Sequence, residues 1–134
     1  MTTIEGAFVR GARVLVVDDS SLVRLYYRDA LEKAGFEVEQ AMNGLEAMEK
    51  ALGGGFDLLV VDINMPKMDG LSFLRELRRS RTEAAAVPAL IITTEAGSED
   101  MQEARAAGAN FYLVKPVSEE DLVAHAEVLA GRVR

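Results

Sequence analysis

Carboxylates stand directly after two of the strongly apolar segments of the sequence. Asp18 and Asp19 follow Val14–Val17, and Asp62 follows Leu58–Val61. A carboxylate can bind a hard cation, and it can also act as a nucleophile toward a phosphoryl group. Three carboxylates brought together would raise one another's pKa values, and a divalent cation would remove that repulsion. These residues are therefore the first candidates for chemistry in this chain.

A hydroxyl pair and a lysine follow two further apolar segments. Thr93 and Thr94 come after Leu90–Ile92, and Lys115 comes after Phe111–Val114. A lysine and a hydroxyl would be unusual partners in a purely structural metal site. They suit an incoming phosphoryl group, because the ammonium neutralises one oxygen and the hydroxyl donates a hydrogen bond to another. The residue types together indicate metal-assisted phosphoryl chemistry.

Each of these residues has a simpler explanation when it is taken alone. An aspartate after a strand is most often a helix cap or a turn residue, and Asp19 fits that role. Thr93 suits a strand because it is β-branched, and Lys115 suits a solvated surface. The combination favours chemistry, because chance placement of all these types at the ends of the right strands is improbable.

The elements that would position these side chains alternate along the chain. Continuously apolar runs, which are typical of strands buried on both faces, lie at 14–17, 58–61 and 90–92, with weaker strand candidates at 36–41 and 111–114. Apolar residues with helical spacing lie between these runs. Five successive βα units predict an α/β fold, with a doubly wound five-stranded parallel sheet and helices on both faces. Ligands bind such sheets outside the carboxyl ends of the strands, so the polar residues should meet in one crevice.

Capping residues mark the helix boundaries, and periodicity predicts the buried faces. Ser20, Asn43, Asp69 and Ser118 are suited to begin helices, and Gly35 and Gly108 are suited to end them. In the first helix, one face carries the apolar residues Leu22, Leu25, Tyr26, Ala30 and Leu31.

Composition limits the classes of protein that fit. The chain has 134 residues, 49% of them hydrophobic, which is enough for one domain with a core. Residues 1–12 are predicted to be a short extension and 13–134 the single domain. A net charge of −7 argues against a broad basic surface for nucleic acid or anionic lipid, and no apolar run reaches membrane-spanning length. The absence of cysteine, with a single histidine, excludes thiolate and histidine-based metal sites and fits a reducing compartment.

Five segments of the chain form a specific pattern. They are Val16-Val17-Asp18-Asp19-Ser20, Asp62-Ile63-Asn64-Met65-Pro66-Lys67-Met68-Asp69-Gly70, Ile92-Thr93-Thr94-Glu95-Ala96, Gly108-Ala109 and Tyr112-Leu113-Val114-Lys115-Pro116. Together they resemble the receiver domain of bacterial two-component response regulators, over about residues 13–129. The single-domain chemotaxis type is the most similar. This resemblance implies the flavodoxin-like strand order 2-1-3-4-5.

The resemblance also implies a role for individual residues at a magnesium site. Asp62 is expected to be the phosphoryl acceptor, and Asp18 and Asp19 the acidic pair at the metal, with Asp19 as the likelier direct ligand. Asn64 would offer its backbone carbonyl. The cofactor is therefore expected to be Mg²⁺, for which Mn²⁺ can substitute.

Three further residues are expected to respond to the phosphoryl group. Thr93 resembles the switch hydroxyl, Tyr112 the aromatic side chain that changes rotamer, and Lys115 the lysine that contacts the phosphoryl oxygens. The bond from Lys115 to Pro116 is expected to be cis. Local charge then alters the surface formed by the fourth helix, fifth strand and fifth helix.

By this resemblance the protein is a cytoplasmic signalling switch. A histidine kinase or histidine phosphotransfer protein would phosphorylate it, and it would control a downstream protein without turning over a metabolite. Neither nucleic acid nor membrane is an expected direct partner. The residues before Phe111 lack the acidic pattern of receivers that dimerise through this surface, which favours a monomer or a weak dimer.

Other functions remain open on the residues alone. A magnesium-dependent phosphohydrolase would usually carry a general acid two residues after the nucleophile, where this chain has Asn64. A binding module that has lost phosphorylation would not need the complete polar set, and a flavin-binding protein would not carry an acidic first loop. Thr94 departs from the small residue common at its position, which predicts slower loss of the phosphoryl group. His125 is expected to be an ordinary helix-surface residue.

Overall fold

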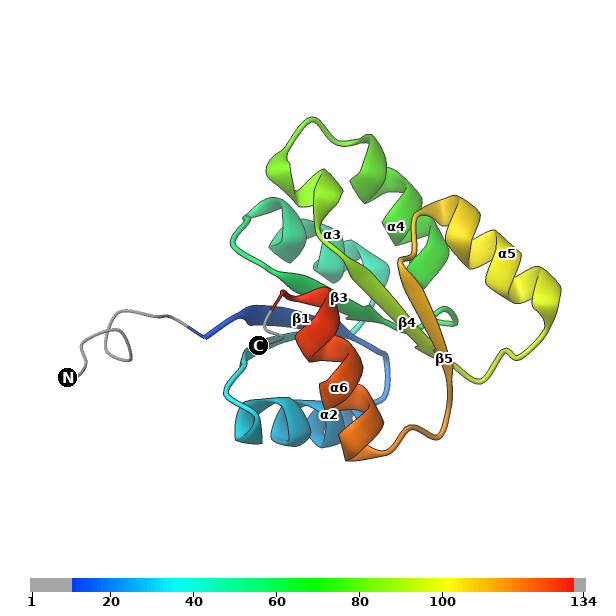
Figure 1. Ribbon diagram of the computed structural model, residues 1–134. Helices are drawn as coiled ribbons and strands as arrows, with labels where there is room; N and C mark the ends of the chain where they lie inside the picture. The colour runs from blue at the N-terminus through cyan, green and yellow to red at the C-terminus, as the bar shows by residue number, and fades with distance from the viewer. Residues whose placement is uncertain (1–10, 132–134) are drawn as a thin grey trace.

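The computed structural model describes residues 11–131, which form a five-stranded parallel sheet with helices on both faces (Figure 1). The predicted extension, residues 1–12, lies outside the described residues except for Gly11 and Ala12. The strands are β1 (Arg13–Val17), β2 (Glu37–Ala41), β3 (Leu58–Val61), β4 (Ala89–Thr93) and β5 (Phe111–Val114). The helices are α2 (Ser21–Lys33), α3 (Gly44–Leu52), α4 (Gly70–Arg79), the 3₁₀-helix η1 (Glu83–Ala86), α5 (Ser98–Ala107) and α6 (Glu119–Leu129).

The strand order is β2-β1-β3-β4-β5, which confirms the predicted doubly wound topology. All neighbouring strands pair in parallel, with Val17 opposite Val61 and Val61 opposite Ile91. The strand order therefore reverses between β1 and β3. The residues after these two strands are Asp18 and Asp62, so both carboxylates begin at the switch point where such sheets bind ligands.

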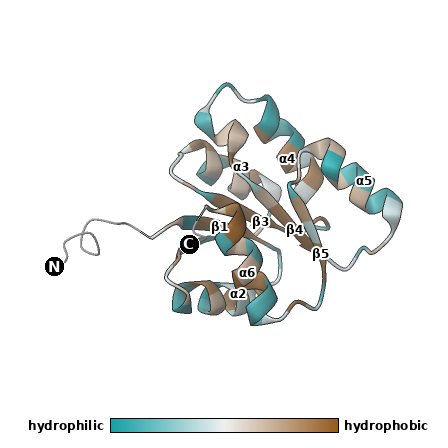
Figure 2. Cartoon of the chain, viewed as in Figure 1, coloured by the Kyte–Doolittle hydropathy of each residue, from teal (hydrophilic) through white to brown (hydrophobic). Residues whose placement is uncertain are grey.

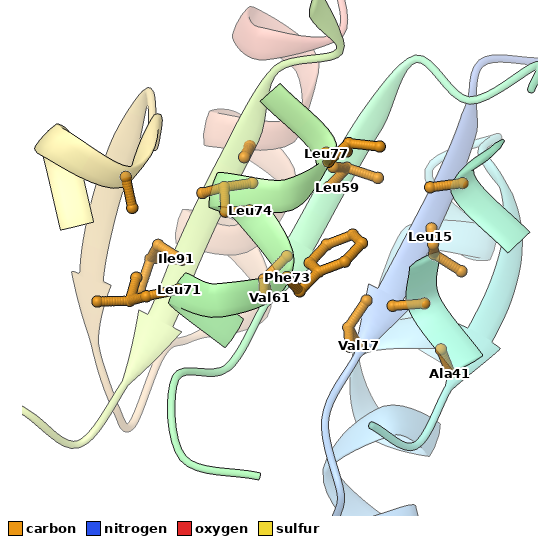
Figure 3. Close-up of a cluster of buried hydrophobic side chains, with 14 of the residues drawn as sticks. Leu15, Val17, Ala41, Leu59, Val61, Leu71, Phe73, Leu74, Leu77 and Ile91 are labelled. Carbon is orange, nitrogen blue, oxygen red and sulfur yellow. The ribbon is translucent and has the colours of Figure 1, made fainter. Parts of the chain in front are cut away.

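Two hydrophobic clusters lie on opposite faces of the sheet. The first contains strand residues such as Leu59 together with side chains of α3, α4 and α5, and the second contains Val60 together with side chains of α2 and α6. Alternate strand residues point to opposite faces, which explains why the central strands are apolar throughout. Figure 2 shows the hydrophobic residues concentrated in these strands, and Figure 3 shows Phe73 and Leu74 of α4 among the strand side chains.

Side-chain caps begin four of the helices as predicted. Ser20 Oγ accepts a hydrogen bond from Val23 N at the start of α2, and Asn43 Oδ1 accepts one from Glu46 N at the start of α3. Asp69 and Ser118 cap α4 and α6 in the same way. These caps satisfy backbone donors that would otherwise lack a partner, and they place each helix start beside the end of a strand.

The predicted buried face of the first helix is wrong for three of its five residues. Ala30 and Leu31 are buried, but Leu22 is 78% exposed and Tyr26 is 41% exposed. Tyr27, which the periodicity left out, is buried instead. The helix packs on the sheet through a face that is rotated by about one residue from the predicted one. Leu22, Leu25 and Tyr26 therefore lie at the surface.

No helix within residues 11–131 is long and apolar enough to cross a membrane.

Candidate functional site

The three predicted carboxylates meet at the carboxyl ends of β1 and β3. Carboxylate oxygens of Asp18, Asp19 and Asp62 all lie within 4.8 Å of one another. Asp18 and Asp62 are buried, whereas Asp19 is exposed. Oxygen donors without histidine or cysteine suit a hard divalent cation, so this cluster could bind a metal ion such as Mg²⁺.

Backbone groups hold two of these carboxylates in place. The Asp18 carboxylate accepts a hydrogen bond from Ser20 N at 2.9 Å, and the Asp62 carboxylate accepts one from Ile63 N at 2.9 Å. Each bond uses one oxygen, Oδ1, of the side chain. These backbone bonds leave the second oxygen of each group, Oδ2, for side-chain partners in the crevice.

Lys115 supplies the cation of the site. Its Nζ lies 2.9 Å from Asp18 Oδ2 and 3.7 Å from Asp62 Oδ2, so the ammonium spans both buried carboxylates. Lys115 N donates to Thr93 O at 2.8 Å, which continues the pairing of β5 with β4 beyond the strand. The peptide bond from Lys115 to Pro116 is cis, as predicted.

The pKa of Asp62 is raised to about 6 from its ordinary value of 3.8. Burial makes the largest contribution, and repulsion from Asp18 adds to it, with a smaller addition from Asp19. The Lys115 ammonium and the Ile63 N–H lower the pKa, but they do not outweigh the burial. A group with such a pKa ionises only partly in weak acid, and any cation bound beside it would favour the carboxylate.

Thr93, Glu95 and Tyr112 form a connected set beside the carboxylates. Thr93 is fully buried, and its Oγ1 accepts a hydrogen bond from Glu95 N at 3.4 Å. The Tyr112 hydroxyl donates to Glu95 O at 2.7 Å. Burial raises the pKa of Tyr112, and the negative charges of Asp100 and Glu95 raise it further. The backbone of Glu95 therefore joins the predicted switch hydroxyl to the predicted switch aromatic.

A side-chain bridge joins the two loops that border the crevice. Asn64 Nδ2 donates to Glu95 Oε2 at 2.7 Å, which connects the loop after β3 to the loop after β4. Asn64 lies two residues after Asp62, and Glu95 lies two residues after Thr93. Each side chain thus lies two residues beyond a buried residue at the end of its strand.

The loop after Asp62 is held close to the strand end by glycine. Gly70 N donates to Ile63 O at 2.8 Å, and a Cβ on Gly70 would lie 2.0 Å from Asp62 O. No side chain fits at that position. Lys67, in the same loop, has a φ of 71°, which is uncommon for a residue with a side chain.

Two polar residues of this region were not predicted as members of the site. The resemblance assigns no role to Glu95, although this residue lies in one of the five segments that carry it, and the sequence pattern does not point to Arg24. Arg24 Nη1 donates to Asp18 O at 2.6 Å, although Arg24 is the fourth residue of α2. A basic residue within a helix gives no local signal that its long side chain returns to the preceding turn.

Comparison with known proteins identifies relatives over most of this chain. Residues 14–127 match the family model described as response regulator receiver domain. The chemotaxis protein CheY1 of Helicobacter pylori is 39% identical over 122 residues, which cover 89% of this chain and 97% of CheY1. The transcriptional regulatory protein PrrA of Mycobacterium tuberculosis is 39% identical over 124 residues, which cover 92% of this chain and 52% of PrrA.

Solved structures agree with these relatives. The chemotaxis protein CheY4 of Vibrio cholerae superposes with a TM-score of 0.84 at 39% identity, covering 89% of this chain and 98% of that one. The receiver domain of the Francisella response regulator 1452 superposes with a TM-score of 0.84 at 28% identity, covering 92% of this chain and all of that one (100%). Sequence and fold lead to the same result, and the chain belongs to the response regulator receiver domain family.

Proposed function

We propose that this protein is a phosphorylation-dependent signalling switch that accepts a phosphoryl group on Asp62 in a Mg²⁺-dependent reaction. The observation that carries this proposal is the convergence of Asp18, Asp19 and Asp62 within 4.8 Å, with Lys115 spanning two of them. The donor would be a phosphohistidine on a histidine kinase or a histidine phosphotransfer protein. The product signals to a downstream protein, and no metabolite is turned over.

In the transfer, an Asp62 carboxylate oxygen attacks phosphorus while the bond from phosphorus to the donor imidazole nitrogen breaks. The imidazole nitrogen recovers its electron pair, and no general base is required because the nucleophile is already an anion. Lys115 neutralises one phosphoryl oxygen, and the Thr93 hydroxyl donates to another once it turns toward the group. Asp18, Asp19, Asp62 and the carbonyl of Asn64 would hold Mg²⁺, which supplies charge neutralisation on the transferring oxygens.

The switch follows from the contacts of Glu95. When the Thr93 hydroxyl turns to the phosphoryl group, it gives up its weak 3.4 Å contact with Glu95 N. The loop that also accepts the Tyr112 hydroxyl then becomes free to shift, and the Tyr112 ring can change rotamer. A cavity of about 230 Å³ beside the ring, lined by Met101, Ala104 and Phe111 among others, leaves space for that change.

Two surfaces suit the partners of such a switch. Leu22 and Leu25 are exposed apolar residues in the first turns of α2, close to Asp19, and they suit docking of the phosphodonor. On α5 and β5, Met101 and Phe111 are exposed beside Tyr112, and they suit the downstream protein. We expect the chain to be a monomer or a weak dimer before phosphorylation.

The test is the intact mass of the protein after incubation with acetyl phosphate, with and without Mg²⁺. We expect a gain of one phosphoryl group that requires Mg²⁺ and is lost in Asp62→Asn. Asp69→Asn is the matched control, because asparagine can still cap α4 and this aspartate lies outside the cluster. A folded wild-type protein that gains no mass under any condition would instead favour a binding module that works without phosphorylation.

A further inference from the structure

Arg24 connects the acidic turn to the edge of the sheet. Besides the 2.6 Å bond to Asp18 O, its Nε donates to Gln40 Oε1 in β2 at 3.0 Å. Gln40 is itself held, because Lys50 Nζ of α3 donates to its backbone carbonyl at 2.5 Å. The Arg24 guanidinium therefore bridges the sheet, through its Nε, and the turn after β1, through its Nη1.

The described residues provide no carboxylate partner for Arg24 within ion-pair distance. The other arginine of α2, Arg28, pairs instead with Asp29 and Glu32 of its own helix. Arg24 is half-buried, and its guanidinium donates hydrogen bonds to two neutral oxygens from separate elements. Because immobilising an arginine side chain is entropically unfavourable, a contact with both a turn and a strand is expected to define local geometry.

The bond to Asp18 O fixes the peptide group that joins Asp18 to Asp19. The Asp18 carboxylate has its own contacts, with Ser20 N and with Lys115 Nζ. Within residues 11–131, no hydrogen bond holds the exposed Asp19 carboxylate. The direction of the Asp19 side chain therefore depends on the orientation of its backbone, which is what the Arg24 contact controls.

We propose that Arg24 is a positioning residue for the acidic pair, and that its bridge from Gln40 to Asp18 O orients Asp19 toward the cation. This inference rests on the proposed function, because it concerns the same Mg²⁺ site. Residues that orient metal ligands typically change metal affinity by about 10- to 100-fold when they are removed. Arg24 acts on the backbone of one ligand from outside the crevice, so we expect a change near the lower end of that range.

The test measures Mg²⁺ affinity by calorimetry in the full chain, together with the free energy of unfolding in metal-free buffer. We expect Arg24→Gln and Arg24→Lys each to weaken Mg²⁺ binding by about 10-fold, since neither side chain can reach both oxygens with a planar fork. Gln40→Leu should weaken binding in the same direction. Its effect should be less than additive with Arg24→Gln, because both changes remove one bridge. Arg28→Gln, one turn further along α2, should leave the affinity unchanged.

The outcomes separate a positioning role from the alternatives. Folded Arg24 variants that bind Mg²⁺ as tightly as the wild type would overturn the proposal. Wild-type affinity in Arg24→Lys, with loss only in Arg24→Gln, would also overturn it, because a single ammonium donor would then suffice and the planar bridge to both oxygens would not be needed. If Arg24→Gln does not fold, Gln40→Leu provides the same test at the other end of the bridge. A wild-type chain that binds no Mg²⁺ would overturn the proposed metal site itself.

Discussion

At the scale of single residues, the carboxylate of the proposed acceptor Asp62 lies where burial and a neighbouring carboxylate destabilise its ionised form. Asp62 is buried beside Asp18, and its pKa of about 6 reflects both conditions. An unfolded chain would ionise this group near pH 4. Between those two pH values the folded protein holds a proton that the unfolded chain releases, so ionisation of Asp62 lowers stability as pH rises through about 6.

Replacing Asp62 by asparagine should therefore stabilise the metal-free protein at high pH. We expect Asp62→Asn to raise the free energy of unfolding by about 2 kcal/mol at pH 8, and the gain should shrink toward zero as pH falls to about 4. Urea denaturation in EDTA at several pH values measures the effect. An equal gain at pH 8 and pH 4 would show that charge burial at Asp62 is not the cause.

Thr94 offers a second test at this scale, because it is exposed and directly follows the buried Thr93. If its side chain crowds the path of the water that attacks the phosphoryl group, Thr94→Ala should shorten the lifetime of phosphorylated Asp62. We expect decay about three-fold faster, a barrier change below about 1 kcal/mol. Thr82→Ala is the control, because Thr82 is also an exposed threonine but does not follow Thr93. Its phosphorylated form should decay at the wild-type rate. An unchanged decay rate in Thr94→Ala would refute this explanation.

Individual site residues were predictable to the extent that their positions follow from the strands. Asp18, Asp62 and Lys115 each come directly after a strand, and parallel strands bring their carboxyl ends to one edge. The contacts of Glu95 and Arg24 were not predictable in this way. The Arg24 contact depends on where a long side chain lies once α2 has packed, and the Glu95 contact depends on where a loop carbonyl lies once β4 and β5 have packed. No local sequence pattern encodes the distance between either pair of atoms.

At the scale of elements, the segment from β3 to α4 is the most tightly constrained part of the site. Gly70 lies against the carbonyl of Asp62, and Gly44 N donates to Met68 O in the same loop at 2.9 Å. These contacts leave the loop after Asp62 little freedom relative to α3 and α4. The position of Asp62 therefore depends on a close backbone approach as well as on its own strand.

A methyl group at Gly70 should disturb both stability and phosphorylation. Gly70→Ala would place Cβ 2.0 Å from Asp62 O and 2.9 Å from Val61 Cγ1, and backbone atoms cannot rotate away. We expect a loss of about 3 kcal/mol in the free energy of unfolding and slower phosphorylation by acetyl phosphate. Gly53→Ala is the comparison, since Gly53 has right-handed helical dihedral angles and its Cβ would lie 3.2 Å from Lys50 O. A Gly70 variant as stable as the Gly53 variant would contradict this expectation.

The first helix shows why element existence was easier to predict than its orientation. Ser20 as the cap and the region of Gly35 as the end were both correct, because capping chemistry is local. The buried face was partly wrong, since apolar residues surround much of α2 and only packing on the sheet selects among them. Tyr27 packs in the core, while Leu22 lies at the surface, three residues after Asp19.

For the whole molecule, stability depends on two separate cores divided by the sheet. Phe73 of α4 is fully buried in the core shared with α3 and α5, and Leu122 of α6 is fully buried in the core shared with α2. The site lies at the end of the sheet between the two layers. Changes within either core should therefore lower stability without altering the chemistry of the carboxylates directly.

Two phenylalanines in different surroundings test how far stability depends on burial in a core. Phe73→Ala removes a fully buried ring and should lower the free energy of unfolding by about 4 kcal/mol. Phe111→Ala removes a ring that is 46% exposed and should lower it by about 1 kcal/mol or less, while weakening binding of a downstream partner. Chemical denaturation of both variants measures the difference. Equal losses would mean that β5 and its surface contribute to the core far more than their exposure indicates.

The three tyrosines of this tryptophan-free chain lie in three different surroundings. The Tyr26 hydroxyl donates to Val117 O at the surface, Tyr27 is buried under α2, and the Tyr112 hydroxyl donates to Glu95 O beside the crevice. Chains grown with fluorotyrosine should therefore give three separate ¹⁹F resonances without any engineered label. The Tyr112 signal would report the proposed switch in real time, and the Tyr27 signal would respond to changes of charge at Asp18 and Asp62, which act on its hydroxyl.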